Sequence, residues 1–416
     1  MKKIILRQIP LGLDEPKEAL RKKAARLLRV TEGDIAALDI LRESLDARKK
    51  EELHFSCHVA VSLLDAAAKK AAAGGAELWA EKKTPDILPG DKPLAGRPVV
   101  VGLGPCGLFA ALRLAQAGLK PLVLERGRPL EERQGDIARL QGEALLDPES
   151  NICFGEGGAG AFSDGKLTTR IKDPRSAQVL KEMIASGAPE EIAYQAKPHL
   201  GTENVRKVVA DIRRRIEKLG GTVLFGAKWL GWQSKNGCVS AALYEYQGKK
   251  LSEETNALVL AIGHSARDTF ARLLEGGLAL ESKPFAVGVR VEHPRQLIDE
   301  NQHGKFAGHP RLGAADYKLT AQAGGRGVYS FCMCPGGEVV CSATEEGAAA
   351  VNGMSYYARD GRLSNSAIVV SVNREDMPAG PLGGVELQRR LEQAAYRAAG
   401  GYGAVAQNIG DFMTGK

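Results

Sequence analysis

The chain has 416 residues, of which 44% are hydrophobic and 26% charged, a balance typical of a globular protein with two or three domains. This composition excludes a small disulfide-stapled module, and no stretch reaches the ~20 apolar residues of a membrane span. The net charge of +7 is spread along the chain, so it supports a nucleic-acid partner only weakly and does not exclude one. Seven cysteines without framework spacing and a start without a signal-peptide pattern predict a cytoplasmic protein with no membrane partner.

Residues 1–88 have the pattern of a small α+β domain. Strands are expected at 2–9, 34–48 and 52–63, and helices at 16–28 and 63–73. This order of elements predicts a ferredoxin-like domain, which a linker rich in proline and glycine at 84–96 separates from the rest. The basic run at 46–50 can contact RNA, although a solvated turn is the more common use of such charges.

The next segment, residues 97–127, carries the clearest motif of the chain. A short buried strand leads into a G-x-G-x-x-G turn formed by Gly102, Gly104 and Gly107, and a helix follows. The first glycine permits the tight turn, the second lets the backbone reach a pyrophosphate, and the third lets helix and strand pack closely. Pro105 and Cys106 open the helix, whose N-terminal N–H groups are expected to face the phosphates.

A second strand follows this helix and ends in an acid, Glu125, about 20 residues after the turn. We expect Glu125 to accept hydrogen bonds from a ribose, with Arg126 beside it in the same site. A complete strand–turn–helix–strand unit with a terminal acid indicates a dinucleotide site; a purely structural turn is the alternative. The unit by itself does not separate NAD from FAD.

The sequence "LERG" at 124–127 resembles the glutathione-reductase-like flavoprotein superfamily, in which the adenosine half of FAD lies beside this strand. The apolar run at 256–262, followed by Gly263, resembles the superfamily's returning strand, whose glycine passes close to FAD. The pattern G-x-G-x-x-G recurs at 155–160, but without the strand and helix that complete a dinucleotide-binding unit, so a separate NAD(P) domain is not expected.

Over its whole length the chain resembles a bacterial family of FAD-dependent dehydrogenases with a ferredoxin-like N-terminal domain. The motifs that carry the resemblance include "SLDARKK", "VGLGPCGLFAALRLAQAG", "CFGEGGAGAFSDGKLTT", "PHLGTENV" and "AIGHSARDTF". The resemblance implies flavin-based oxidoreduction of a small-molecule substrate or redox partner, with NAD(P)H as a candidate electron donor. It also implies that family members continue beyond "NIGDFMTGK" into another glycine-rich flavin-binding section, which is absent here.

The stretch "GAFSDGKL" at 160–167 matches a phosphate-binding P-loop except at its last position, where Leu167 has no hydroxyl for Mg²⁺. A glycine-rich stretch precedes it and a proline soon follows, so neither the strand nor the helix of a P-loop is expected. We interpret the segment instead as a second glycine-rich flavin loop. Its expected cofactor residues are Gly157, Gly158, Gly160, Asp164 and Lys166. A lysine beside the flavin would stabilise the anionic reduced ring; a solvated lysine is the alternative.

From residue 283 onward, short alternating strands predict an antiparallel substrate domain. Within it, "FCMCPGGEVVC" is expected to form a hairpin around Gly336 and Gly337, with Cys332, Cys334 and Cys341 on one face. A redox pair or a soft-metal site is conceivable for these thiols, but packing as small buried hydrophobes is favoured, and no metal is expected.

Two histidines, His199 and His264, are candidate proton donors, although each can equally be a structural hydrogen-bonding residue.

The fold class we expect is α/β. It combines a Rossmann-like FAD-binding core at 96–282, an inserted antiparallel substrate domain with a C-terminal helix at 283–416, and the ferredoxin-like N-terminal domain. The expected function is that of a FAD-dependent oxidoreductase of unidentified substrate. Two alternatives stay open: a flavoprotein that acts on RNA through its N-terminal domain, and a non-catalytic flavin-binding protein.

Overall fold

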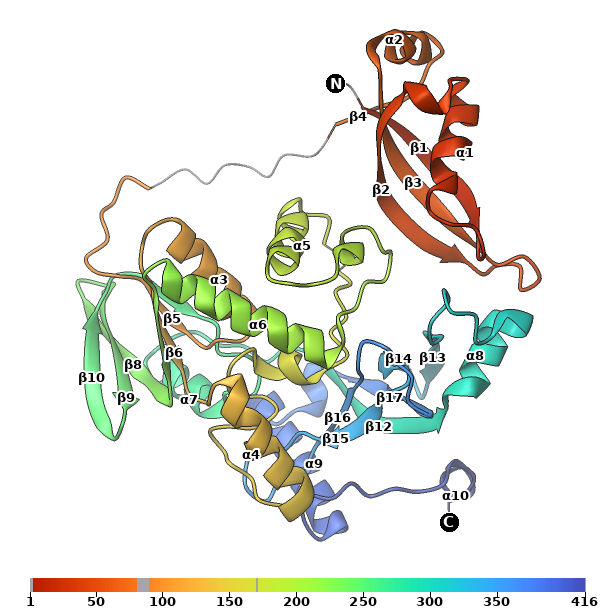
Figure 1. The fold of residues 1–416 in the computed structure, drawn as a ribbon. Helices are drawn as coiled ribbons and strands as arrows, with labels where there is room; N and C mark the ends of the chain where they lie inside the picture. Colours follow the sequence, from red (N-terminus) through yellow and green to blue (C-terminus); the bar gives the residue numbers. More distant parts are fainter. Residues whose placement is uncertain (1–2, 81–89, 170, 416) are drawn as a thin grey trace.

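The computed structural model describes residues 3–80, 90–169 and 171–415 of the chain, which fold into a mixed α/β structure (Figure 1). Residues 84–89 of the expected linker lie outside the described residues. Among the described helices, none combines the length and the apolar character that a membrane crossing requires.

The N-terminal part forms one antiparallel sheet with strand order β2-β3-β1-β4. Its elements are β1 (Lys3–Gly12), α1 (Ala19–Leu28), β2 (Ile35–Asp46), β3 (His54–Leu63), α2 (Asp65–Ala73) and β4 (Leu78–Trp79). Alternate residues of β3 point to the helices, so that Phe55, Cys57 and Val59 are buried against α1 and α2. The sequence predicted the three long strands and both helices, but not the two-residue strand β4.

The N-terminal sheet is attached to the rest of the chain through its β2 edge. The backbone N–H of Glu43 donates to the carbonyl of Tyr194, and the N–H of Ala196 donates to the carbonyl of Glu43, both at 2.8 Å. Lys17 adds a hydrogen bond from its Nζ to the Tyr194 hydroxyl at 2.6 Å. On the other side, the guanidinium of Arg311 lies 4.8 Å from the ring centre of Phe55. Residues from both later parts of the chain therefore hold this domain.

The middle part is built on a parallel sheet with strand order β11-β5-β6-β7. Its elements are β5 (Val99–Val101), α3 (Pro105–Gln116), β6 (Leu122–Glu125), α4 (Leu130–Glu143), α5 (Arg175–Ala185), α6 (Gly201–Lys218), β7 (Thr222–Phe225), β11 (Leu258–Leu260) and α7 (Arg267–Glu275). Helices α3 and α6 lie side by side over one face and share an apolar core that includes Leu108, Ala111 and Ile212.

The other face of the parallel sheet is covered by a three-stranded antiparallel sheet of order β10-β9-β8. Its strands are β8 (Ala227–Lys235), β9 (Cys238–Tyr246) and β10 (Lys249–Glu254). Trp229 and Tyr244 from this sheet pack against Val101 and Leu124 of the parallel strands. The parallel strands are thus buried on both faces, which explains their continuous runs of valine and leucine.

The C-terminal part contains an antiparallel sheet of order β12-β17-β14-β13 and a separate pair, β15 with β16. The elements are β12 (Phe285–Pro294), α8 (Arg295–His303), β13 (Thr320–Ala323), β14 (Arg326–Cys334), β15 (Glu338–Cys341), β16 (Val351–Met354), β17 (Leu363–Val372), α9 (Gly383–Ala399) and α10 (Ile409–Thr414). Strand β17, which the sequence analysis did not predict, lies between β12 and β14.

The expected hairpin around Gly336 and Gly337 is wrong. Strand β14 pairs with β13 and β17, whereas β15 pairs with β16, so the two halves of "FCMCPGGEVVC" belong to different sheets. The chain does turn at Pro335–Gly336, but the strands on either side do not pair, and both glycines make close backbone contacts. A Cβ on Gly336 would lie 1.9 Å from the carbonyl oxygen of Arg359, and a Cβ on Gly337 would lie 2.3 Å from that of Met354.

Candidate functional site

A cavity of about 540 Å³ lies where the parallel strands β5, β6 and β11 end. In open α/β sheets, ligands bind outside these carboxyl ends. Segments far apart in the chain form its wall: the turn before α3, the end of β6, the glycine-rich stretch after α4, strand β8 and the residues after β11. The lining includes Gly102, Gly104, Pro105, Cys106, Glu125, Arg126, Cys153, Gly158, Gly160, Trp229, Gly263 and His264.

The three glycines of the first turn have separate structural roles. Gly102 has a φ of +95°, in the region that side chains rarely adopt. A Cβ on Gly107 would lie 1.9 Å from the carbonyl oxygen of Gly102, so helix α3 and strand β5 can approach only because this position is glycine. Gly104 differs, since a Cβ there would meet only the Cα of Gly158, at 3.9 Å. Two glycines are therefore required by the fold, and the third keeps the cavity open.

Glu125 is buried at the end of β6, and its carboxylate organises the surrounding loops. It accepts backbone hydrogen bonds from Leu103 at 2.7 Å, Gly127 at 2.9 Å and Gly155 at 3.0 Å. These three donors come from both glycine-rich segments and from the turn after β6. The sequence predicted a ribose as the partner of Glu125 but not this structural role, because the residues alone do not show which backbone groups come near.

Arg126 lies at one end of the cavity and carries a cluster of charges. Its Nη2 donates to both carboxylate oxygens of Asp268, at 2.8 and 2.9 Å, and its guanidinium lies 4.6 Å from the ring centre of Phe154. Burial favours a higher pKa for Asp268, but Arg126 and Lys228 outweigh it and lower that pKa to about 2. The carboxylate is thus ionised at neutral pH and holds Arg126 in place.

The second glycine-rich stretch is held by a fully buried arginine, Arg133 of α4. Its guanidinium donates to four backbone carbonyls, those of Asn151, Ile152, Glu156 and Gly158, at distances from 2.6 to 2.9 Å. Burial lowers the pKa of Arg133 to about 10, so it stays charged at neutral pH. Because one guanidinium binds four carbonyls of the segment 151–158, Arg133 fixes the shape of this wall.

Not all of the predicted cofactor residues reach the cavity. Those that line it are Gly102, Gly104, Pro105, Cys106, Glu125, Arg126, Gly158, Gly160 and Gly263; those that do not are Gly107, Gly157, Asp164 and Lys166. Gly107 acts through helix packing, and a Cβ on Gly157 would lie 3.0 Å from the Cβ of Ala161 and 3.1 Å from Val209. These two positions support the wall from behind.

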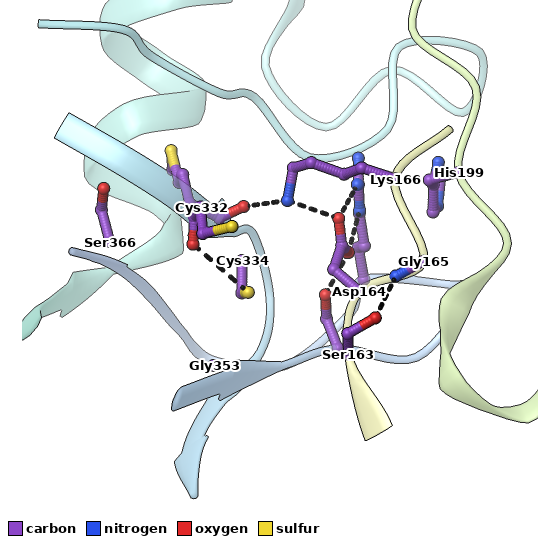
Figure 2. A network of polar contacts seen from close by, with 12 residues as sticks. Ser163, Asp164, Gly165, Lys166, His199, Cys332, Cys334, Gly353 and Ser366 are labelled. Atoms are coloured by element: carbon purple, nitrogen blue, oxygen red, sulfur yellow. Dashed lines mark hydrogen bonds and ion pairs between the residues drawn. The ribbon is translucent and has the colours of Figure 1, made fainter. Parts of the chain in front are cut away.

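Asp164 and Lys166 belong to a polar network at the boundary with the C-terminal sheet (Figure 2). The buried Asp164 accepts hydrogen bonds from Ser355 and Arg359, and Lys166 Nζ contacts it at 2.6 Å and also donates to the carbonyl of Met333. Burial favours a higher pKa for Asp164, but Arg359 and Lys166 lower it to about 2. This cluster joins the segment after the second glycine-rich wall to strand β14.

The rejection of a P-loop at 160–167 agrees with the structure. A short 3₁₀ turn at Gly158–Phe162 takes the place of a strand, and the next helix, α5, begins only at Arg175. The N-terminus of a helix is therefore not available to receive a triphosphate here.

The two candidate histidines lie in different places. His264 lines the cavity, and burial together with the nearby charge of Arg267 lowers its pKa. His199 lies outside the cavity, where its ring stacks on that of Tyr357 at 5.2 Å and its Nε2 lies 3.0 Å from the Tyr357 carbonyl oxygen. Burial is also the main cause of its lowered pKa. Only His264 is placed to act on a ligand of the cavity.

The three thiols do not share one face, because the expected hairpin does not form. Cys334 is buried, Cys332 is exposed, and Cys341 lies on β15 and pairs across the strands with Val351. Burial raises the pKa of both Cys334 and Cys341. In the part of the chain that the structure describes, no three His, Cys, Asp or Glu side chains form a group that could hold a metal ion.

A protein from Clostridium beijerinckii, described only as an uncharacterized protein, is 46% identical over 416 residues. The match covers 99% of this chain and 77% of the relative, so the chain belongs to the same family as this clostridial protein. Residues 284–416 match the family "FAD-dependent protein, C-terminal domain-like", and residues 1–62 match a domain of unknown function, DUF8436.

Solved structures similar to the chain include 3-ketosteroid-Δ4-(5α)-dehydrogenase from Rhodococcus jostii, at 15% identity and a TM-score of 0.32 over 56% of this chain and 65% of that one. A geranylgeranyl bacteriochlorophyll reductase-like protein from Thermoplasma acidophilum aligns at 14% identity and a TM-score of 0.32, over 73% and 61% of the two chains. The chain thus spans less than two thirds of either solved chain. At these scores the likeness carries no functional information.

Proposed function

We propose that the chain binds FAD in the cavity at the strand ends and acts as a FAD-dependent oxidoreductase, a dehydrogenase of a small-molecule substrate or redox partner. The observation that carries the proposal is the opening of Gly104, at the N-terminus of α3, into a cavity of about 540 Å³. The match of the C-terminal part to a FAD-dependent family supports a flavin rather than a nicotinamide in this cavity.

The residues present suit the two halves of the cofactor. The first N–H groups of α3 have no partner within the helix and favour a pyrophosphate. Glu125 already accepts three backbone hydrogen bonds, and because an ionised carboxylate has about four acceptor sites, one remains for a ribose hydroxyl. Gly158, Gly160 and Gly263 present bare backbone to the cavity, where side chains would otherwise take the space of the cofactor.

Flavin, when bound, supplies the hydride and electron transfer itself. The chain's own residues orient it, exclude water and manage protons. His264 is the cavity residue suited to the last role, because it lines the cavity and because burial and Arg267 lower its pKa and so favour the neutral imidazole. Trp229 and Leu124, both buried, give the opposite wall an apolar surface that excludes water.

In this proposal the parallel sheet with its β8–β10 cover is a glutathione-reductase-like, Rossmann-like FAD domain. The C-terminal sheet is the substrate domain, and the N-terminal sheet, with its order β2-β3-β1-β4, is a ferredoxin-like accessory domain. NAD(P)H is the proposed electron donor, and the cytoplasm the proposed location.

The test uses the purified full chain. It should be yellow or become so on addition of FAD, with saturable quenching of flavin fluorescence, and NADH or NADPH should bleach the bound flavin under anaerobic conditions. Failure to bind FAD at any concentration would remove the proposal. Binding without bleaching by either nucleotide would keep the cofactor and remove NAD(P)H as the donor.

A further inference from the structure

Arg290 of β12 is partly buried, and its hydrogen-bond partners among the described residues are all uncharged. Its Nε donates to Asn365 Oδ1 at 2.8 Å, and its Nη2 donates to the Cys332 carbonyl at 2.8 Å and lies 3.8 Å from Cys334 Sγ. Within residues 3–80, 90–169 and 171–415, no Asp or Glu forms an ion pair with it. A positive charge that is partly removed from water without a counter-ion is costly, so this place favours an anion.

The guanidinium is held in one orientation by its surroundings. A Cβ on Gly353 would lie 2.3 Å from Arg290 Nη2 and 2.4 Å from Asn365 Oδ1, so the backbone of β16 packs directly on both groups. Cys332 adopts a φ of +43°, unusual for a residue with a side chain, at the bulge of β14 where its carbonyl meets Arg290. Asn365 is fully buried, and its Nδ2 has no hydrogen-bond partner. A second donor beside Arg290 is therefore unused.

The neighbouring network adds to the positive charge. Among the described residues, Lys166 and Arg359 share a single carboxylate, that of Asp164, which leaves one positive charge over. Cys334 lies close to this pair as well as to Arg290, since the charges of Lys166 and Arg290 both act on its thiol. Figure 2 shows Lys166, Cys332 and Cys334 together at the end of β14. Three cations and one anion leave a surplus of two positive charges.

An apolar surface adjoins this charge on the same face of the sheet. Arg290 is paired across the strands with Ala367, and Ala367 with Phe331, so all three side chains point to one side. The ring of Phe331 is 63% exposed. A ligand with an oxyanion at Arg290 would place its apolar body on this ring.

We propose that Arg290 and Asn365 bind the oxyanion group, a carboxylate or a phosphate, of a small-molecule ligand whose apolar part packs on Phe331. Arginine presents two parallel N–H donors to such groups, and the fixed orientation lowers the entropic cost of binding. That this ligand is the substrate of the oxidoreductase rests on the proposed function. Anion binding itself does not, and it can be measured without flavin.

The experiment uses the flavin-free full chain with benzoate and, separately, inorganic phosphate, both at constant ionic strength. The readout is the alkylation rate of single cysteines by iodoacetamide, resolved by peptide mass spectrometry. Cys332 reports on the proposed site, Cys106 on the glycine turn, and Cys238 is a distant exposed reference. We expect benzoate or phosphate to slow alkylation at Cys332 and to leave Cys238 unchanged. Protection by benzoate alone assigns a carboxylate, and protection by phosphate alone assigns a phosphate.

Arg290→Gln should weaken this protection by roughly tenfold or more, the usual effect of losing a charge-assisted hydrogen bond. The matched control is Arg326→Gln on the same sheet, because Arg326 already has an ion-pair partner in Asp376 at 2.5 Å. Asn365→Asp gives a second route, since a carboxylate supplied by the chain should occupy Arg290 and abolish protection. No protection at Cys332, or equal protection in all three variants, overturns the proposal. Protection at Cys106 alone places the anion at the glycine turn and overturns it too, while leaving the FAD proposal intact.

Discussion

The backbone of Gly158 lies against that of Gly104: a Cβ on Gly158 would come 3.1 Å from the Gly104 Cα. One glycine belongs to the turn before α3 and the other to the stretch held by Arg133. The hydrogen bond from the N–H of Gly157 to the carbonyl of Leu103, at 2.9 Å, joins the same two segments. Both walls of the cavity therefore form one packed unit, and substitutions within it divide into those that fill the cavity and those that break the wall.

Gly104→Val should fill the cavity and leave the wall intact. Its φ of −70° suits any residue, and a Cβ meets only the Gly158 Cα at 3.9 Å, so the variant should fold. The isopropyl group then takes the space proposed for the pyrophosphate. We expect FAD affinity to fall by more than roughly a hundredfold, the effect of about 3 kcal/mol.

Fluorescence titration with FAD measures this change, alongside a thermal melt. The matched control is Gly135→Ala, in helix α4, where a Cβ meets nothing within 4 Å. It should keep FAD affinity and gain a little helix stability. A folded Gly104→Val protein with undiminished FAD affinity would reject the assignment of this turn.

Arg133→Lys should break the wall. A lysine cannot reach four carbonyls at once, and each carbonyl left buried without a donor is destabilising. The free energy of unfolding should fall by about 3 kcal/mol, as for other buried charged groups that lose their partners. Arg139→Lys on the same helix is the control, because the side chain of Arg139 is 48% exposed. Urea denaturation of both variants provides the comparison, and equal losses would contradict the role given to Arg133.

Asp164→Asn should produce a stability difference that depends on pH. The folded-state pKa of Asp164 is about 2, below its ordinary value of 3.8, so its carboxylate stabilises the fold above about pH 4 and loses this effect as the pH falls toward 2. At pH 7 the variant should be less stable than the original chain by about 3 kcal/mol, because Arg359 and Lys166 lose the carboxylate with which both are paired. The difference should shrink between pH 4 and about 2. Denaturation curves that stay parallel over this range would refute the assignment.

Lys166→Met should leave the flavin potential of the loaded protein unchanged. The ammonium group is already paired with Asp164 at 2.6 Å and lies outside the cavity lining, so its charge is compensated before it can act on a flavin. Reductive titration of both proteins measures the potential. A more negative potential in the variant would restore the interpretation of Lys166 as a cofactor residue.

Neither protein should bind ATP in the presence of Mg²⁺, since Leu167 cannot ligate the metal.

The local motifs were predictable from the sequence because they depend on neighbouring residues. Gly102 and Gly107 are fixed by a turn and a helix only a few positions apart, and the alternation in β3 is likewise a local pattern. The sequence could not reveal that Glu125 binds the backbone of Gly155, or that Arg133 holds the same stretch, because those contacts depend on how separate segments meet.

The hairpin predicted for the three cysteines does not form, because contacts between distant segments outweigh the local pattern. Two glycines between alternating residues have the local pattern of a tight turn, but distant backbone at Arg359 and Met354 occupies the space beside them. Asp164 and Lys166 were expected at the cofactor for a similar reason. Both residues follow the glycine-rich wall in the chain. However, Asp164 pairs with Arg359 and Lys166 donates to the Met333 carbonyl, and both partners are remote in sequence.

The backbone bridge at Glu43 has a mechanical consequence. The two residues that bond to it, Tyr194 and Ala196, lie just before His199 and the start of α6, and α6 packs under the cavity wall. A force on the N-terminal sheet is thus transmitted along the short segment 196–200 to the base of that wall. Any displacement of the sheet must either break both 2.8 Å hydrogen bonds or pull on the first turn of α6. A macromolecule that binds the N-terminal sheet would therefore act on the cavity wall without entering the cavity.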